Sequence, residues 1–236
     1  MLRELITILR SSDPLRAMRD NFIRMLQITH KMTIDAGEIY FGKTATPGDR
    51  TRLYEQDVEV NQLERTIRKQ VVAHLSFQGN IPDMPHCLLL MSLAKDVERL
   101  GDYAKNLSEV LDIWPEKLPD DEIKQELLEI AHGVEEAFQS TSVVFTTSDE
   151  EKALVYIRQG RDIAHRCDSL LQRIASGSCE AGVTAAQVLG ARYYKRIGGH
   201  VLNVLSGVVM PLHKVDYYDE DEISKESADN PGDSAE

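Results

Sequence analysis

The chain has 236 residues and a formal net charge of −12 at pH 7, which would repel phosphate backbones and argues against nucleic acid as the main partner. Much of that charge is local, because residues 216–236 hold nine acidic residues and one lysine. Aromatic residues contribute only 6%, and the abundant straight-chain residues lose little rotamer freedom in helices. The composition therefore favours an all-α fold.

The chain shows no feature of an exported or membrane-spanning protein. Three cysteines, Cys87, Cys167 and Cys179, are odd in number and lack CxxC spacing, so they predict neither a disulfide framework nor a thiolate zinc site. The first ten residues, MLRELITILR, mix charges into apolar positions, unlike a secretory signal, and we expect a helix that caps the first bundle. No apolar stretch approaches the roughly 20 residues of a spanning helix. These features predict a cytoplasmic protein.

Every proline falls between periodic segments, where its missing donor interrupts no helical hydrogen bond. The sequence predicts six helices, at residues 14–40, 49–77, 84–113, 120–146, 149–175 and 180–209. In the second helix, Leu53, Val60 and Ile67 belong to one apolar stripe at 3.6-residue spacing. Residues 216–236 are rich in charge and poor in apolar side chains, so we expect a disordered acidic tail.

The two halves of the chain resemble one another. A shift of 97 residues aligns the third helix with the sixth and matches Arg99 with Arg196, Gly101 with Gly198, and Asn106 with Asn203. A shift of 104 aligns the second helix with the fifth and places His165 against Asn61 and Asp168 against Glu64. This repeat predicts two tandem three-helix bundles, at residues 1–115 and 116–215.

Oxygen-bearing side chains gather on the second and third helices. Glu98, Asp102 and Asn106 are spaced i, i+4, i+8 and share one strip, opposite the apolar stripe that includes Leu93, Leu100 and Leu107. The strip should therefore face outward or line a shallow groove. Asp57, Asn61 and Glu64 flank the stripe of the second helix, and antiparallel packing would bring all six side chains together. Four carboxylates and two amides suit hard or borderline cations such as Mg²⁺, Mn²⁺ or iron.

A simpler interpretation is a solvated acidic face that forms ion pairs with Arg65 or Arg99. Gly101 bears on this choice, because a glycine inside a helix costs roughly 1 kcal/mol relative to alanine. Its presence predicts the close approach of either a neighbouring helix or a cation.

Two segments of the first half, VNQLERTIRKQVVAHL and LLLMSLAKDVERLGDYAKNLSEV, resemble the PhoU family of bacterial phosphate-uptake regulators. The resemblance covers residues 14–212 and is strongest in the first half. It implies two three-helix bundles with metal clusters on the surface, held by an E/D-x-x-x-D element on paired helices. Glu98 and Asp102 match that element, and Asp57 matches it with Asn61 in place of the second acid. Glu64 matches the acid that follows. The implied ion is iron, zinc, manganese or magnesium.

The resemblance also implies a role. It predicts a regulatory adaptor rather than an enzyme, one that dampens phosphate uptake and phosphate-starvation signalling and so acts indirectly on transcription. Its partners would be a membrane phosphate transporter, a sensor histidine kinase, or both, met on the cytoplasmic side. Such partners would hold the protein at the inner membrane. A homodimer is compatible with the resemblance.

The second half departs from the family pattern. Lys195 and Gly199 occupy the positions equivalent to Glu98 and Asp102, so a second metal site would rest on His165 and Asp168. Alternatively, the positive charge of Lys195 takes the place of a metal cation and neutralises neighbouring acidic side chains. Before the third helix, Asp83-Met84-Pro85 replaces the Asp-Leu-Arg that is common in the family.

Two rival functions stay open. A metal-free helical scaffold would bind partners through helix faces alone. A ferritin-like carboxylate metalloenzyme would need two inward-facing Glu-x-x-His pairs, and the sequence offers one candidate, Glu129 with His132.

Overall fold

The computed structural model describes residues 13–42 and 46–216 and is all-helical over that range. Its long helices are α2 (Pro14–Tyr40), α3 (Pro47–Leu75), α4 (Met84–Glu109), α5 (Glu122–Thr147), α6 (Glu150–Ala175) and α7 (Ala181–Val209). Three short 3-10 segments connect or extend them: η1 (Gln78–Asp83), η2 (Val110–Asp112) and η3 (Leu212–Lys214). All six predicted helices are confirmed. The expectations for MLRELITILR and for the acidic tail beyond Asp216 lie outside the described residues.

Short polar side chains begin three of the helices. Asp13, Asp121 and Asp149 each precede a helix and accept a hydrogen bond from the backbone N–H three residues later, at 2.9–3.1 Å. Each bond satisfies one of the donors that a helix leaves unpaired at its start. Ser148 separates α5 from α6 in the left-handed conformation, with φ of 53°, which reverses the chain in a tight turn.

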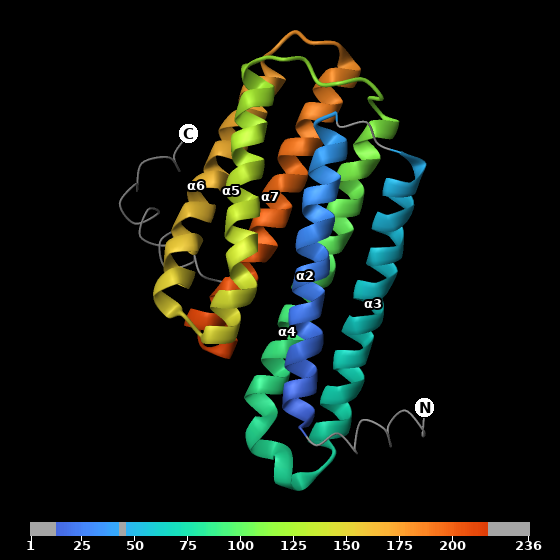
Figure 1. The fold of residues 1–236 in the computed structure, drawn as a ribbon. Coiled ribbons are helices and arrows are strands. Elements are labelled where there is room, and N and C mark those ends of the chain that lie inside the picture. Colours follow the sequence, from blue (N-terminus) through green and yellow to red (C-terminus); the bar gives the residue numbers. More distant parts are fainter. Residues whose placement is uncertain (1–12, 43–45, 217–236) are drawn as a thin grey trace, which may run out of the picture.

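The helices form two groups of three that lie side by side (Figure 1). In the first group α2 packs against α3 and α4, and in the second α7 packs against α5 and α6. The groups meet mainly where α4 contacts α7, with a smaller contact between α2 and α5. The turn between α3 and α4 extends beyond the end of the second group. The first group therefore has one end that no helix of the second group covers.

Apolar side chains from all six helices form one continuous core. Leu93, Leu100 and Leu107 of α4 are fully buried, as the stripe predicts, whereas Leu89 and Leu111 are only partly buried. A second set on α4, including Ala94 and Val97, is also fully buried, because this helix packs against both α2 and α7. Burying a leucine contributes roughly 1.5–3 kcal/mol, so α4 is a principal support of the whole fold.

Gly101 faces the neighbouring helix α2. A Cβ atom at this position would lie 3.5 Å from Thr29 and 3.6 Å from Met32, which is ordinary van der Waals contact. An alanine side chain would therefore fit here, and the packing of α2 against α4 does not require a glycine at position 101.

Candidate metal site between α3 and α4

Lys105 connects the two acidic strips. Its Nζ atom donates to Asp57 of α3 at 3.0 Å and to Asp102 of its own helix at 3.4 Å. The Lys105 and Asp57 side chains are 19% and 12% exposed, respectively. Burial opposes the charge of Lys105, but the Asp57 and Asp102 carboxylates outweigh it and raise the pKa of Lys105. A positive charge therefore already lies between the two carboxylates.

The other predicted acidic ligands also have basic partners. Arg68 donates to Glu64 at 2.6 Å, and Lys95 donates to Glu98 at 2.7 Å. Arg99 donates to Asp102 at 3.3 Å, as the ion-pair interpretation predicts. Each of the four carboxylates thus contacts at least one lysine or arginine.

The two strips are largely covered, and we call the space between them the groove. Asp57 and Glu64 are buried, and Asn61 donates a long hydrogen bond of 3.5 Å to Asp57. Glu98 is 13% exposed at its side chain, and Asn106 is half-buried on the same face of α4. Of the two predicted placements, outward or in a groove, this burial between α3 and α4 favours the second.

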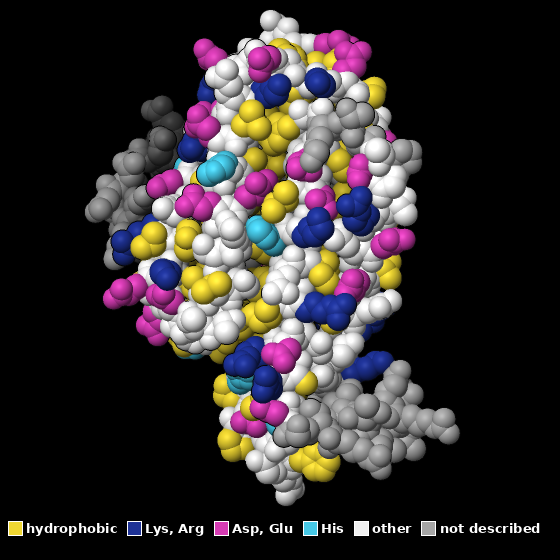
Figure 2. All heavy atoms as spheres, viewed as in Figure 1, with side chains coloured by type: hydrophobic (Ala, Val, Ile, Leu, Met, Phe, Trp, Pro, Cys, Tyr) yellow, Lys and Arg dark blue, Asp and Glu magenta, His cyan; other side chains and the backbone are white. Residues whose placement is uncertain are grey.

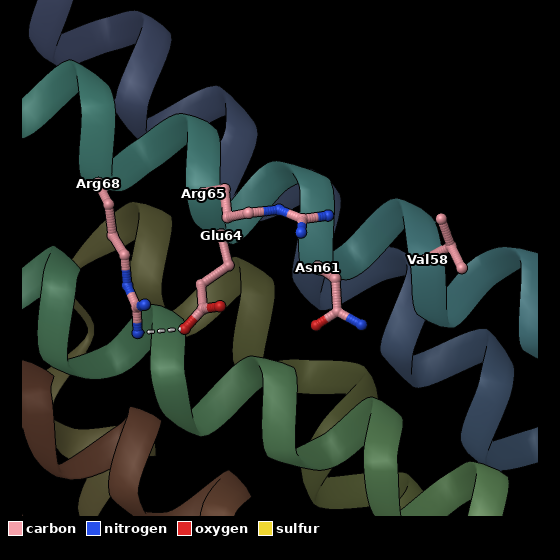
Figure 3. A pocket seen from close by; sticks show the side chains of 5 residues that line it. All are labelled: Val58, Asn61, Glu64, Arg65 and Arg68. Carbon is pink, nitrogen blue, oxygen red and sulfur yellow. Dashed lines mark hydrogen bonds and ion pairs between the residues drawn. The ribbon is translucent and has the colours of Figure 1, made fainter.

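A shallow hollow opens beside Glu64 on the outer side of α3, and Figure 3 shows its lining. Glu64 and Arg68 point toward one another across it, and Arg65 and Asn61 complete its polar wall. Val58 closes the far end. The ion-pair partner of Glu64 is Arg68, and Arg65 lines the same hollow. A ligand in the hollow would meet two guanidinium groups and one carboxylate.

Over residues 13–42 and 46–216, no three His, Cys, Asp or Glu side chains are arranged to hold a metal ion. The predicted ligands nevertheless have suitable chemistry, since carboxylate oxygens from two helices, of Asp57 and Asp102, lie beside the ammonium group of Lys105. A metal cation would compete with Lys105 for those oxygens. Binding would require Lys105 to swing out and the carboxylates to change rotamer.

The sequence of the first three helices matches a known domain. Residues 22–111, which include the whole of α3 and α4, match the family model described as the PhoU domain. This part of the chain is therefore similar to the PhoU domain.

Relatives extend the likeness to most of the chain. A Synechocystis protein named phosphate-specific transport system accessory protein PhoU homolog is 23% identical over 161 residues, which is 66% of this chain and 71% of the relative. The crystal structure of PhoU from Pseudomonas aeruginosa shares the fold with a TM-score of 0.76 at 21% identity, covering 85% of this chain and 97% of that one. The crystal structure of the phosphate transport system regulatory protein PhoU from Streptococcus pneumoniae also shares the fold, with a TM-score of 0.67 at 14% identity. The match covers 83% of this chain and 93% of that one.

The second half of the chain has an ion pair at the positions where the first half has acidic residues on facing helices. Lys195, which replaces Glu98, donates to Asp168 of α6 at 2.5 Å. Asp168 is the equivalent of Glu64. Lys195 therefore places a positive charge beside this acid, as the interpretation of Lys195 as a substitute for a cation predicts. His165 is exposed on α6. His200 contacts Asp96 of α4, so it lies at the junction with the first group.

The candidate ferritin-like pair does not face the core. Glu129 is 68% exposed at its side chain and accepts a hydrogen bond from Arg166 at 2.6 Å. An inward-facing Glu-x-x-His pair is therefore absent at Glu129 and His132, the one place where the sequence offers it. In addition, no helix in the described part of the chain is long and apolar enough to cross a membrane.

Sequence reasoning missed a polar cluster at the junction of the two groups. Asp96 is 8% exposed and accepts hydrogen bonds from His200 and Asn203 of α7, both at 2.7 Å. Asp96 lies three residues after Leu93 and four before Leu100, and so on the apolar stripe of α4. A carboxylate on an apolar stripe was the available signal, since such a group needs a buried partner.

Proposed function

We propose that this protein is a cytoplasmic regulator of phosphate transport and of phosphate-starvation signalling, which acts by binding other proteins rather than by catalysis. The observation that carries the proposal is the PhoU domain over residues 22–111. The names of its relatives support it, because they describe accessory and regulatory proteins of phosphate transport systems.

The proposed partners are the cytoplasmic parts of a membrane phosphate transporter, of a sensor histidine kinase, or of both. Contact with them would place the protein at the inner membrane and would affect transcription indirectly. Deleting the gene should raise phosphate uptake and expression of phosphate-responsive genes in phosphate-rich medium. Normal uptake together with normal expression would contradict the regulatory role.

We further propose that a metal cation binds between α3 and α4 and orders the surface that docks on these partners. The carboxylates of Asp57, Glu64, Glu98 and Asp102 would hold it, with the amides of Asn61 and Asn106 beside them. Iron, zinc, manganese and magnesium are the candidate ions, since all accept oxygen ligands. A bound cation would join α3 to α4 more firmly than Lys105 does, because it offers several ligand positions at once.

The test is elemental analysis of metal per chain after reconstitution, on the native protein and on the double variant Glu98→Ala, Asp102→Ala. The native protein should retain metal and the variant should lose it. The matched control is Glu151→Ala, Asp162→Ala, which removes two exposed acids from α6. Equal metal content in all three proteins would contradict the site, and so would a native protein without metal.

One observation favours a second candidate, the metal-free scaffold. Each of the four carboxylates contacts a lysine or an arginine, so the groove is already balanced in charge. In that case the Glu98→Ala, Asp102→Ala variant would carry as little metal as the native protein but would still regulate uptake. Loss of both metal and regulation in the variant would favour the metal-dependent function.

A further inference from the structure

The turn between α3 and α4 exposes apolar side chains at the uncovered end of the first group. Phe77, Ile81, Met84 and Leu88 are 51%, 52%, 41% and 43% exposed, and we call these four residues the apolar tip. Exposed apolar residues are common singly, but these four lie within twelve residues, which comprise the turn and the start of α4. Such a feature marks a contact surface.

Hydrogen bonds hold the turn that carries the apolar tip. Nε2 of His74 lies 2.8 Å from a carboxylate oxygen of Asp83, and His74 is buried. The Asn80 side chain donates to the His74 carbonyl at 2.9 Å, and its backbone N–H donates to the Phe77 carbonyl at 3.0 Å. The apolar side chains are therefore presented by an ordered turn.

The surroundings of the apolar tip are basic, although the protein is acidic. Residues 64–95 include four lysines and arginines and two acids, of which Glu64 pairs with Arg68 and Asp83 faces His74. The chain as a whole carries a net charge of −12. The Asn21 side chain donates to Gln70 at 3.0 Å, which sets the start of α2 level with the turn. That start adds Arg16 and Arg19 but also two aspartates, so the local excess of positive charge is unchanged.

The apolar tip also projects. In Figure 1 the turn between α3 and α4 extends past the end of α5, α6 and α7. Figure 2 shows apolar side chains at this lower end of the molecule, with both basic and acidic side chains a little above them. A flat surface could approach the tip without meeting the second group of helices.

We propose that the apolar tip docks on an anionic lipid bilayer, with Phe77 and Ile81 entering the interface and Arg65 and Lys69 facing the lipid phosphates. Apolar area and positive charge both contribute to such binding, and each basic residue near an anionic surface adds about 1 kcal/mol. A second copy of this chain fits less well, because two basic tips would repel each other. The contact does not depend on the proposed regulatory role, since it needs lipid alone.

The experiment is vesicle flotation with the full chain. The protein should float with vesicles of phosphatidylcholine mixed with phosphatidylglycerol, stay behind with phosphatidylcholine alone, and be released by salt. The double variant Phe77→Ser, Ile81→Ser should lose at least about tenfold in affinity for the anionic vesicles. Both side chains are exposed, so the fold should be retained, and circular dichroism would verify it.

The matched control is Leu128→Ser, Val143→Ser, which removes equally exposed apolar side chains from α5 and should bind like the native protein. Absence of native binding to anionic vesicles would overturn the proposal, as would equal binding by the tip variant. Two further outcomes would also overturn it. One is a native dimer that the tip variant turns into a monomer in light scattering. The other is binding that is lost on removing residues 1–10 and unaffected in the tip variant.

Discussion

His200 of α7 lies 2.7 Å from Asp96 of α4, and this pair joins the two groups of helices through a mostly buried carboxylate. Asn203 donates to the same oxygen of Asp96 at 2.7 Å. Tyr103 stacks on the His200 ring, with 5.6 Å between ring centroids. The junction of the groups is thus a specific polar contact within an apolar interface.

Replacing His200 by alanine should reduce the free energy of unfolding by roughly 1–3 kcal/mol, because Asp96 would lose one of its two donors while remaining buried. Urea denaturation measures this change. His165→Ala is the control, since His165 is exposed on the neighbouring helix and should change stability by less than about 0.5 kcal/mol. Equal stabilities of the two variants would refute a structural role for the pair.

Asp216 should make stability depend on pH. Burial raises the pKa of Asp216 to about 6, and the Asp96 carboxylate adds to the effect while His200 opposes it. An unfolded aspartate has a pKa of about 3.9, so the native state binds the extra proton and its stability falls as pH rises from about 4 to about 6. The change should be about 1 kcal/mol after allowance for solvent screening, since the side chain is only partly buried.

Asp216→Asn removes this titration. Urea denaturation at several pH values should show a smaller loss of stability through that window than in the native protein. Parallel curves for the two proteins would mean that Asp216 titrates normally in the folded state.

Two glycines of α7 should respond in opposite ways to alanine. A Cβ atom at Gly190 would lie 2.0 Å from the hydroxyl oxygen of Tyr40. The Tyr40 side chain is buried, and its hydroxyl group donates to the Ala186 carbonyl at 3.0 Å. Gly190→Ala should therefore cost roughly 1–3 kcal/mol. A Cβ at Gly199 would meet nothing within 4 Å, so Gly199→Ala should gain up to about 1 kcal/mol from helix propensity. Thermal unfolding would rank the variants, and a gain at both positions would contradict the close contact at Gly190.

Replacing Lys105 by methionine should leave the repulsion between the Asp57 and Asp102 carboxylates uncompensated. Asp57 and Asp102 would lose the ammonium group that they share, and metal-free stability should fall by roughly 1–3 kcal/mol. If the groove binds metal, a divalent cation should restore the loss and bind more tightly than to the native protein. The control is Lys31→Met, which breaks an exposed pair with Asp35 on α2 and should change stability by less than about 1 kcal/mol. Unchanged stability in the Lys105 variant would rule out a structural role for the bridge.

The helices and their boundaries could be read from the sequence, because both depend on local interactions. Prolines and the N-cap residues Asp13 and Asp149 mark ends within the chain itself, and the apolar stripe of α4 follows from 3.6-residue spacing. The same periodicity placed Glu98, Asp102 and Asn106 on one strip. Local hydrogen bonds and helix geometry suffice for these inferences, and no distant residue enters them.

The tertiary structure decided what each strip contacts. Sequence spacing could not show that Lys105 reaches Asp57 on another helix, nor that α4 would be buried on two sides. It also could not pair His200 with Asp96, which is 104 residues away. Such contacts depend on how six helices pack together, and that arrangement is set by the summed burial of side chains from the whole chain rather than by any one segment.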